Sequence, residues 1–192
     1  MPGGKFAGGI SYQTRKNKDY HNVEHLLNPE KSSEIFQKNK EYYLASANKI
    51  KARLILAKTR IGNVELKENE ALFLNQKISK GIKWIETLKI NIQNAKDNLE
   101  FQKAVLYEEW HAVKLIPRSA EGYASSVLVE KNLEKKTNPD IKNIDNAYSH
   151  LIKAKNLLMN LLNSDKYTNF ELAEKQLIKA YDELDLALKY LD

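Results

Sequence analysis

The sequence predicts an all-α protein: an elongated antiparallel bundle of about five helices, preceded by a Gly-rich N-terminal arm. Three observations favour this fold. Glycine and proline are scarce, at seven and four of 192 residues, which disfavours a turn-rich β fold. Apolar residues return every three or four positions through most of the chain, as on one face of a helix. Asparagine and threonine stand where helix N-caps are needed, just before several of these segments.

The first 27 residues are expected to form an extended basic arm. Glycines occupy four of the first nine positions and interrupt regular structure there. A polar run follows and contains three cations, Arg15, Lys16 and Lys18. We therefore divide the chain into an arm over 1–27 and a single helical bundle domain over 28–192, which is long enough to bury a core.

A first long helix is predicted over 29–61. Asn28 is a favourable N-cap, and Pro29 suits the first helical position, where no backbone N–H is needed. Gly62 provides a C-terminal stop, and Asn63 is placed to cap the next helix at once. Such a short connection requires an antiparallel hairpin. Seven residues form the apolar face: Phe36, Tyr43, Ala47, Ile50, Leu54, Ala57 and Ile61.

A second long helix is predicted from about residue 64 to about residue 115, and we expect the other helices to pack against it. Asp97 and Glu100 have the spacing of a capping box, which would start a new helix there. Because neither glycine nor proline lies near these two residues, we expect the helix to continue through Asp97. Its apolar face contains Ile78, Ile82, Ile85, Leu88, Ile92, Ala95, Leu99, Leu106, Trp110 and Val113.

Pro117 is expected to end or kink this helix, with residues 118–122 as a connector. Three further helices are predicted, over about 121–136, 140–163 and 169–191. Thr168 and Glu171 form a capping-box pattern at the start of the last helix.

The positive charge is concentrated near the N-terminus. The formal net charge is +6, yet the first 60 residues hold 12 Lys/Arg against 5 Asp/Glu, so the remainder is close to neutral. This asymmetry favours the association of the N-terminal part with nucleic acid.

Motifs that carry chemistry are missing from the sequence. There is no cysteine, no Gly-rich phosphate-binding loop and no nucleophile elbow. Glu108 and His111 form one half of a di-iron carboxylate motif, but no second Glu-x-x-His exists to complete it. We therefore expect no catalytic centre, no metal site and no cofactor.

No apolar segment is long enough to span a bilayer, and no apolar leader core lies near the N-terminus. The lack of such a leader favours a cytoplasmic protein.

Two surfaces remain as candidate binding sites. One is a basic stripe along the first helix, made of residues that recur at helical spacing and supplemented by the cations of the arm: Lys31, Lys38, Tyr42, Lys49, Arg53 and Arg60. The other is a cluster around Pro117, which is interpreted either as a pocket or as a packed corner: Tyr107, Trp110, His111, Arg118, Glu121 and Tyr123.

The sequence favours a non-catalytic interaction or assembly protein that contacts other protein chains, copies of itself included, through its helical surface and arm. The alternative is a nucleic-acid-associated helical protein that uses the arm and the basic stripe without sequence specificity. Salt dependence separates the two, because phosphate binding weakens steeply with salt and apolar helix association does not.

Overall fold

The computed structural model describes residues 29–105, 107–135, 141–165 and 169–190, and within them the protein is all-α. The described residues form no strand, so the predicted fold class is confirmed. Five helices have 20 to 34 residues and one has seven. In chain order they are α1 (Pro29–Gly62), α2 (Glu68–Asn94), α3 (Asn98–Ala104), α4 (Tyr107–Glu134), α5 (Ile141–Asn163) and α6 (Phe170–Lys189).

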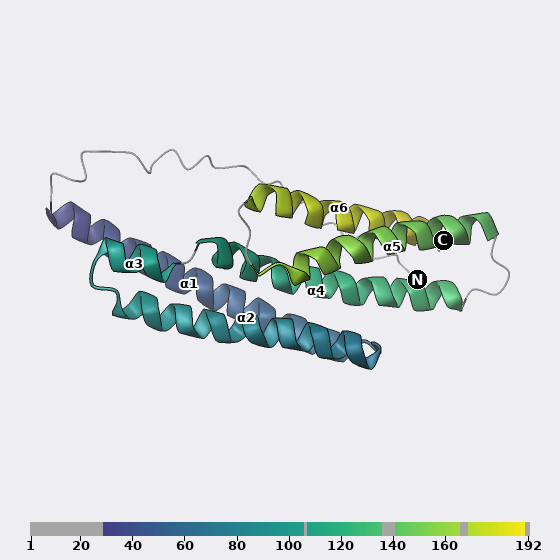
Figure 1. Ribbon diagram of the computed structural model, residues 1–192, viewed down its shortest axis with the longest axis horizontal. Helices are drawn as coiled ribbons and strands as arrows, with labels where there is room; N and C mark the ends of the chain where they lie inside the picture. The colour runs from purple at the N-terminus through teal and green to yellow at the C-terminus, as the bar shows by residue number, and fades with distance from the viewer. Residues whose placement is uncertain (1–28, 106, 136–140, 166–168, 191–192) are drawn as a thin grey trace, which may run out of the picture.

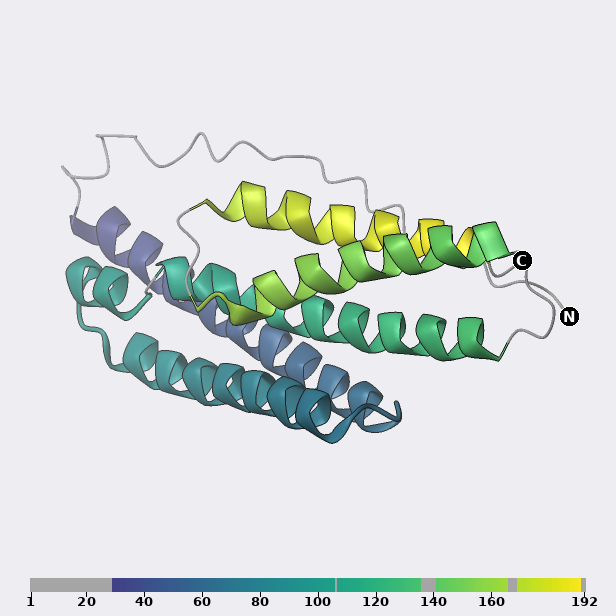
Figure 2. The same cartoon turned by 45° about the vertical axis from the view of Figure 1, so that its right-hand side comes forward.

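Helix α4 lies between two helical hairpins. Figures 1 and 2 both show the α1–α2 hairpin on one side of α4 and the α5–α6 hairpin on the other, in an elongated molecule. Consecutive long helices run antiparallel, as predicted. Helix α1 instead runs parallel to α4, because Tyr43 contacts Trp110 and Arg60 contacts Glu121 farther along both helices. The central helix is therefore α4, whereas the sequence pointed to a helix over 64–115.

The core is continuous through both hairpins. The predicted apolar face of α1 is confirmed, since six of its seven residues are buried and Tyr43 packs against the core. On the other side of α4, Gly122 permits close helix packing. A Cβ at this position would lie 3.1 Å from a methyl of Leu158 on α5 and 3.3 Å from the ring of Tyr181 on α6.

The prediction of one helix over 64–115 is wrong at residues 95–97 and again at Val105, where α3 ends before α4 begins at Tyr107. Helix α2 ends at Asn94, and Asp97 caps α3 by accepting a hydrogen bond from the N–H of Glu100 at 2.8 Å. The Glu100 carboxylate in turn accepts from the N–H of Lys96 at 2.7 Å, which completes a reciprocal cap at the break. Since α3 starts on a new axis, Leu99 leaves the apolar face and is 60% exposed.

Pro117 was predicted to end or kink a helix, with a connector after it, but the structure shows no break in the helix there. Pro117 lies inside α4, which continues to Glu134. An interior proline removes one helical hydrogen bond and costs about 3 kcal/mol. Packing offsets that cost, because α4 buries residues towards α1, α2, α5 and α6.

The ends of two helices also differ from the prediction. Asn63 does not cap α2, which begins at Glu68 after a five-residue connection, with Lys67 in the N-cap position. The N-cap of α6 is Asn169, whose side chain accepts from the N–H of Leu172 at 3.0 Å. Thr168, the predicted cap, lies outside the described residues.

The arm over 1–27, with Arg15, Lys16 and Lys18, also lies outside the described residues, so the division into arm and bundle stays a prediction. Among the helices of the described residues, none combines the length and the hydropathy that crossing a membrane requires.

Candidate binding pocket and surfaces

The cluster predicted around Pro117 does not converge on one cavity. Trp110 packs between Tyr43 of α1 and Trp84 of α2, with ring centroids 5.4 and 6.4 Å away. His111 stacks on Phe170 of α6 at 4.1 Å. Since these neighbours lie on opposite sides of α4, the two adjacent side chains face different hairpins.

The other members of the cluster also diverge. Arg118 lies over the ring of Tyr181 on α6, whereas Glu121 pairs with Arg60 of α1 at 2.8 Å. Tyr123 donates a hydrogen bond to Glu70 of α2 at 2.7 Å. The cluster therefore ties α4 to α1, α2 and α6, which favours its interpretation as packing. The side chain of Tyr107, its sixth member, lies outside the described residues.

Burial perturbs the titratable groups of this region. Burial, with the nearby charge of Lys114 as a smaller cause, lowers the pKa of His111 to about 4. Burial also raises the pKa of the Tyr123 phenol, and the hydrogen bond to Glu70 adds to this effect. Both side chains are therefore neutral at pH 7 and do not carry charge to the surface.

The basic stripe on α1 is only partly available as a cationic surface. Lys38 pairs with Glu34 at 2.6 Å, and Arg60 pairs with Glu121. Lys49 and Arg53 are exposed and form no ion pair or hydrogen bond with another residue that the structure describes. Tyr42 is 65% exposed. The side chain of Lys31 lies outside the described residues, and within the described part of the stripe two cations and one aromatic ring are exposed without an ion pair.

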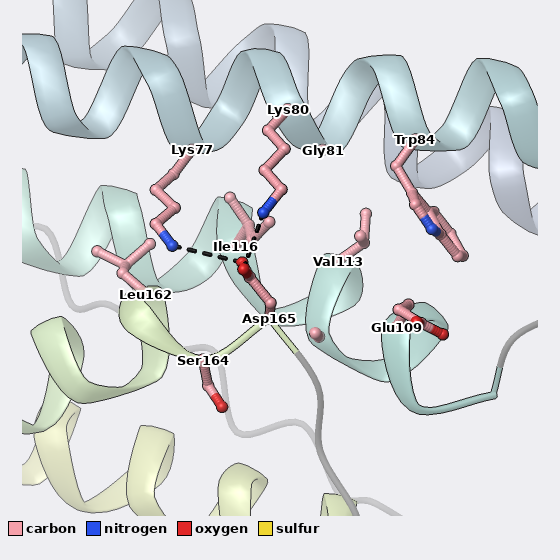
Figure 3. Close-up of a pocket in the computed structure, with 11 residues that line it drawn as sticks. Lys77, Lys80, Gly81, Trp84, Glu109, Val113, Ile116, Leu162, Ser164 and Asp165 are labelled. Carbon is pink, nitrogen blue, oxygen red and sulfur yellow. Dashed lines mark hydrogen bonds and ion pairs between the residues drawn. The ribbon is translucent and has the colours of Figure 1, made fainter.

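A pocket that the sequence reasoning missed lies between α2, α4 and the end of α5, and Figure 3 shows it. It has a volume of about 300 Å³, at the lower end of the ~300–1,000 Å³ typical of ligand sites. Most of its lining is apolar. The lining residues are Lys77, Lys80, Gly81 and Trp84 of α2, Glu109, Ala112, Val113 and Ile116 of α4, and Leu162, Ser164 and Asp165.

The charged groups of this pocket lie at two ends, as Figure 3 shows. At one end, Lys77 and Lys80 reach from α2 to the same carboxylate, Asp165, at 3.4 and 2.8 Å. The hydrogen bond from Lys80, with the charge of Lys77 as a further cause, holds the pKa of Asp165 below its usual range. At the other end, Glu109 lies beneath Trp84.

The sequence carried a signal for this pocket. Lining residues on α2 follow the order i, i+3, i+4, i+7, and those on α4 repeat it. Both faces combine a small residue with charged side chains, and the α2 face adds the aromatic ring of Trp84. The third wall, from Leu162 to Asp165, could not be joined to them without knowing how α5 folds back.

A second hollow is a groove of about 410 Å³ between α4 and α6. Its floor is apolar and includes the buried Val129 and Leu184. Ile178 and Leu188 stand on its rim and are 50% and 40% exposed. Arg118, Ser125, Tyr181, Asp182 and Asp185 complete the lining.

No group of three or more His, Asp or Glu side chains within the described residues is placed to hold a metal ion. Comparisons of the chain with protein-family models, with curated proteins and with solved structures found no match, so its function has to be argued from its own residues.

Proposed function

We propose that this chain is a non-catalytic interaction protein that binds an amphipathic helix of another protein chain in the groove between α4 and α6. The observation that carries the proposal is the pair of exposed aliphatic side chains on the groove rim, Ile178 and Leu188, above a buried apolar floor. Covering this rim removes apolar surface from water, which contributes ~25 cal/mol of favourable free energy for each Å² buried. Docking of a helix between two existing helices is a common mode of peptide recognition.

The charges around the groove define the partner more closely. Asp182 and Asp185 are exposed on α6 and have no ion-pair partner among the described residues. They lie on the same face as Ile178, at spacings of four and seven residues. A partner helix with an apolar face and basic residues beside it complements this rim.

Site-specific crosslinking in the source cells tests this proposal. A photoreactive residue at position 178 samples the groove, and one at position 152 is the matched control, because Ile152 is exposed to a similar extent on α5 outside the groove, at 57% against 50%. We expect crosslinks from 178 alone, to a basic amphipathic segment of a partner or of a second copy. The segment is then synthesised as a peptide and its affinity is measured.

Ile178→Asp should weaken the binding of that peptide by at least ten-fold, because the substitution places a charge against the apolar face of the peptide. The fold should be retained, since exposed substitutions usually change stability by about 0.5 kcal/mol or less. Equal crosslinking from 178 and 152, or a peptide whose affinity is insensitive to Ile178→Asp, would overturn the proposal.

One observation favours nucleic-acid binding as a second candidate function. Lys49 and Arg53 are four residues apart on an exposed face of α1, the exposed Tyr42 lies seven residues before Lys49, and neither cation is neutralised by a described neighbour. Cations and an aromatic ring are the groups that hold a phosphate backbone and stack a base.

The double variant Lys49→Glu and Arg53→Glu tests this candidate. If both residues bind phosphates, the variant should abolish binding to duplex DNA or RNA and leave the fold intact. Neutral replacements should flatten the log–log salt dependence of duplex DNA binding by ~0.9 for each phosphate that is no longer neutralised. The matched control is Lys175→Glu with Lys179→Glu, which makes the same charge change at the same spacing on α6. Failure of the wild type to bind at micromolar concentration and low salt removes this candidate.

A further inference from the structure

The pocket between α2, α4 and the end of α5 has the chemistry of a site for a small amphipathic anion. It is separate from the α4–α6 groove, since the two share no lining residue. The inference therefore does not depend on the interaction function proposed above.

The apolar part of the pocket is built by three elements. Trp84 hangs from α2 and faces Val113 and Ile116 of α4, and Leu162 closes the end where α5 stops. Gly81 brings the backbone of α2 close to α4, because a Cβ there would lie 3.3 Å from the Cδ1 atom of Ile116. A volume of about 300 Å³ accommodates a fused two-ring aromatic or a short alkyl chain.

The charged end supplies the polar recognition. Lys77 is the better enclosed lysine, with 18% of its side chain exposed, and its ammonium also lies 5.7 Å from the centre of the Phe73 ring. Lys80 is 66% exposed and shares Asp165 with it. Two ammonium groups thus meet one carboxylate, which leaves hydrogen-bond donors for a second anion.

We propose that this pocket binds a small molecule with an apolar ring or chain and one acidic group, a carboxylate or sulfonate. The apolar part lies against Trp84, Val113 and Ile116. The acidic group binds Lys77 and Lys80, beside Asp165 or in its place. Glu109 at the far end disfavours a ligand with a second acidic group there, because like charges repel in an enclosed site.

The test uses 2-naphthoate as the probe and 2-naphthamide, which has the same rings without the charge, as its match. Binding is followed by calorimetry and by quenching of Trp84 fluorescence, with Trp84→Phe identifying the signal from the pocket. We expect saturable binding of naphthoate and at least ten-fold weaker binding of naphthamide, as expected when a charge-assisted hydrogen bond is removed.

Three variants then probe the charged end. Lys77→Gln and Lys80→Gln should each weaken the binding of naphthoate several-fold. The matched control is Lys83→Gln, an exposed change on the same helix outside the pocket. Asp165→Asn should strengthen naphthoate binding, because it removes the carboxylate that occupies the two lysines.

Other results would contradict the proposed anion site. If Lys77, Lys80 and Asp165 only fasten the end of α5 to α2, then Asp165→Asn lowers the unfolding midpoint and naphthoate does not bind. The proposal is overturned if neither the wild type nor Asp165→Asn shows saturable binding at low-millimolar naphthoate. It is also overturned if the wild type binds naphthamide with the same affinity as naphthoate. Circular dichroism on each variant establishes that the comparison is made on folded protein.

Discussion

Burial holds the His111 imidazole in its neutral form, because its pKa in the folded protein is about 4 against 6.5 for an exposed imidazole. The unfolded chain therefore takes up a proton first as pH falls. Between these two pKa values the unfolded state binds more protons, so stability rises with pH in that window. The contribution is complete above pH 6.5 and is lost as pH falls towards 4.

Lowering the pH from 6.5 to about 5 should therefore cost about 1.5 kcal/mol of unfolding free energy from this residue. The measurement is urea unfolding of wild type, His111→Phe and His111→Gln across that range, where most carboxylates stay ionised. Both variants should lose this part of the pH dependence. A variant with the same slope as wild type would show that another group carries it.

Trp110 should act as a core residue. It is 3% exposed and lies between aromatic rings from α1 and α2. Trp110→Ala should cost about 3–5 kcal/mol, the usual range for truncating a buried aromatic side chain. Tyr42→Ala, at an exposed ring, is the control and should cost about 0.5 kcal/mol or less. A small loss of stability at Trp110, with a loss of binding to a partner, would instead restore the pocket interpretation of the Pro117 cluster.

At the scale of helices, the start of α6 rests on one side-chain cap. The Asn169 side chain accepts from the N–H of Leu172, so Asn169→Ala should cost about 1 kcal/mol and Asn169→Asp much less. Thermal melts of both variants and of Thr168→Ala test this. If Thr168→Ala costs more than Asn169→Ala, the helix begins one residue earlier, as the sequence pattern suggests.

The helical character of the chain was predictable, because the apolar faces of helices are local patterns. Helices α1, α5 and α6 and the buried face of α1 follow from spacing and caps, whereas α2, α3 and α4 do not match the helices predicted over 64–115 and 121–136. The break at residues 95–97 was misjudged, although Asp97 and Glu100 signalled it. Part of its stabilisation comes from a distant residue: Lys40 of α1 donates to the carbonyls of Gln93 and Ala95 at 3.1 and 2.9 Å. Such a contact satisfies exposed carbonyls at a helix end, and no local pattern reveals it.

Pro117 shows the opposite error, because a helix continues where its local preference indicated a break. Its local preference is to end a helix, yet α4 continues because the residues on both sides of it pack against neighbouring helices. The predicted cluster around it failed for a related reason. Residues close in sequence on a helix point to different sides, so Trp110 and His111 belong to different hairpins.

At the scale of the whole molecule, α4 is the element that both hairpins share. Its side chains contact α1 and α2 through Trp110 and Tyr123 and α6 through Arg118, and Gly122 lets Leu158 of α5 pack close to the backbone of α4. Among the described residues, few contacts outside α4 join the hairpins, and the pair of lysines on α2 that meets Asp165 is one of them. Neither hairpin can therefore lose its packing without exposing one side of α4.

This arrangement predicts that damage to the α5–α6 hairpin is felt in the α1–α2 hairpin. Leu158→Ala removes a fully buried side chain that packs at Gly122, and it should cost about 2–5 kcal/mol. Both tryptophans, Trp84 and Trp110, lie on the α1–α2 side of the molecule, so their fluorescence reports on that hairpin. Circular dichroism reports on all helices. If folding is cooperative across α4, the two signals should shift together to a single lower urea midpoint.

Independent folding of the two hairpins would give a different pair of unfolding curves. If the hairpins fold independently, Leu158→Ala should split the dichroism curve into two steps and leave the tryptophan midpoint at its wild-type value. Ile152→Ala, at an exposed position on α5, is the control and should move neither signal appreciably. Coincident shifts for Leu158→Ala and none for Ile152→Ala would establish that α4 couples the two hairpins. A ligand in the pocket between α2 and α5 would then stabilise both hairpins at once, because it binds only where they are folded together.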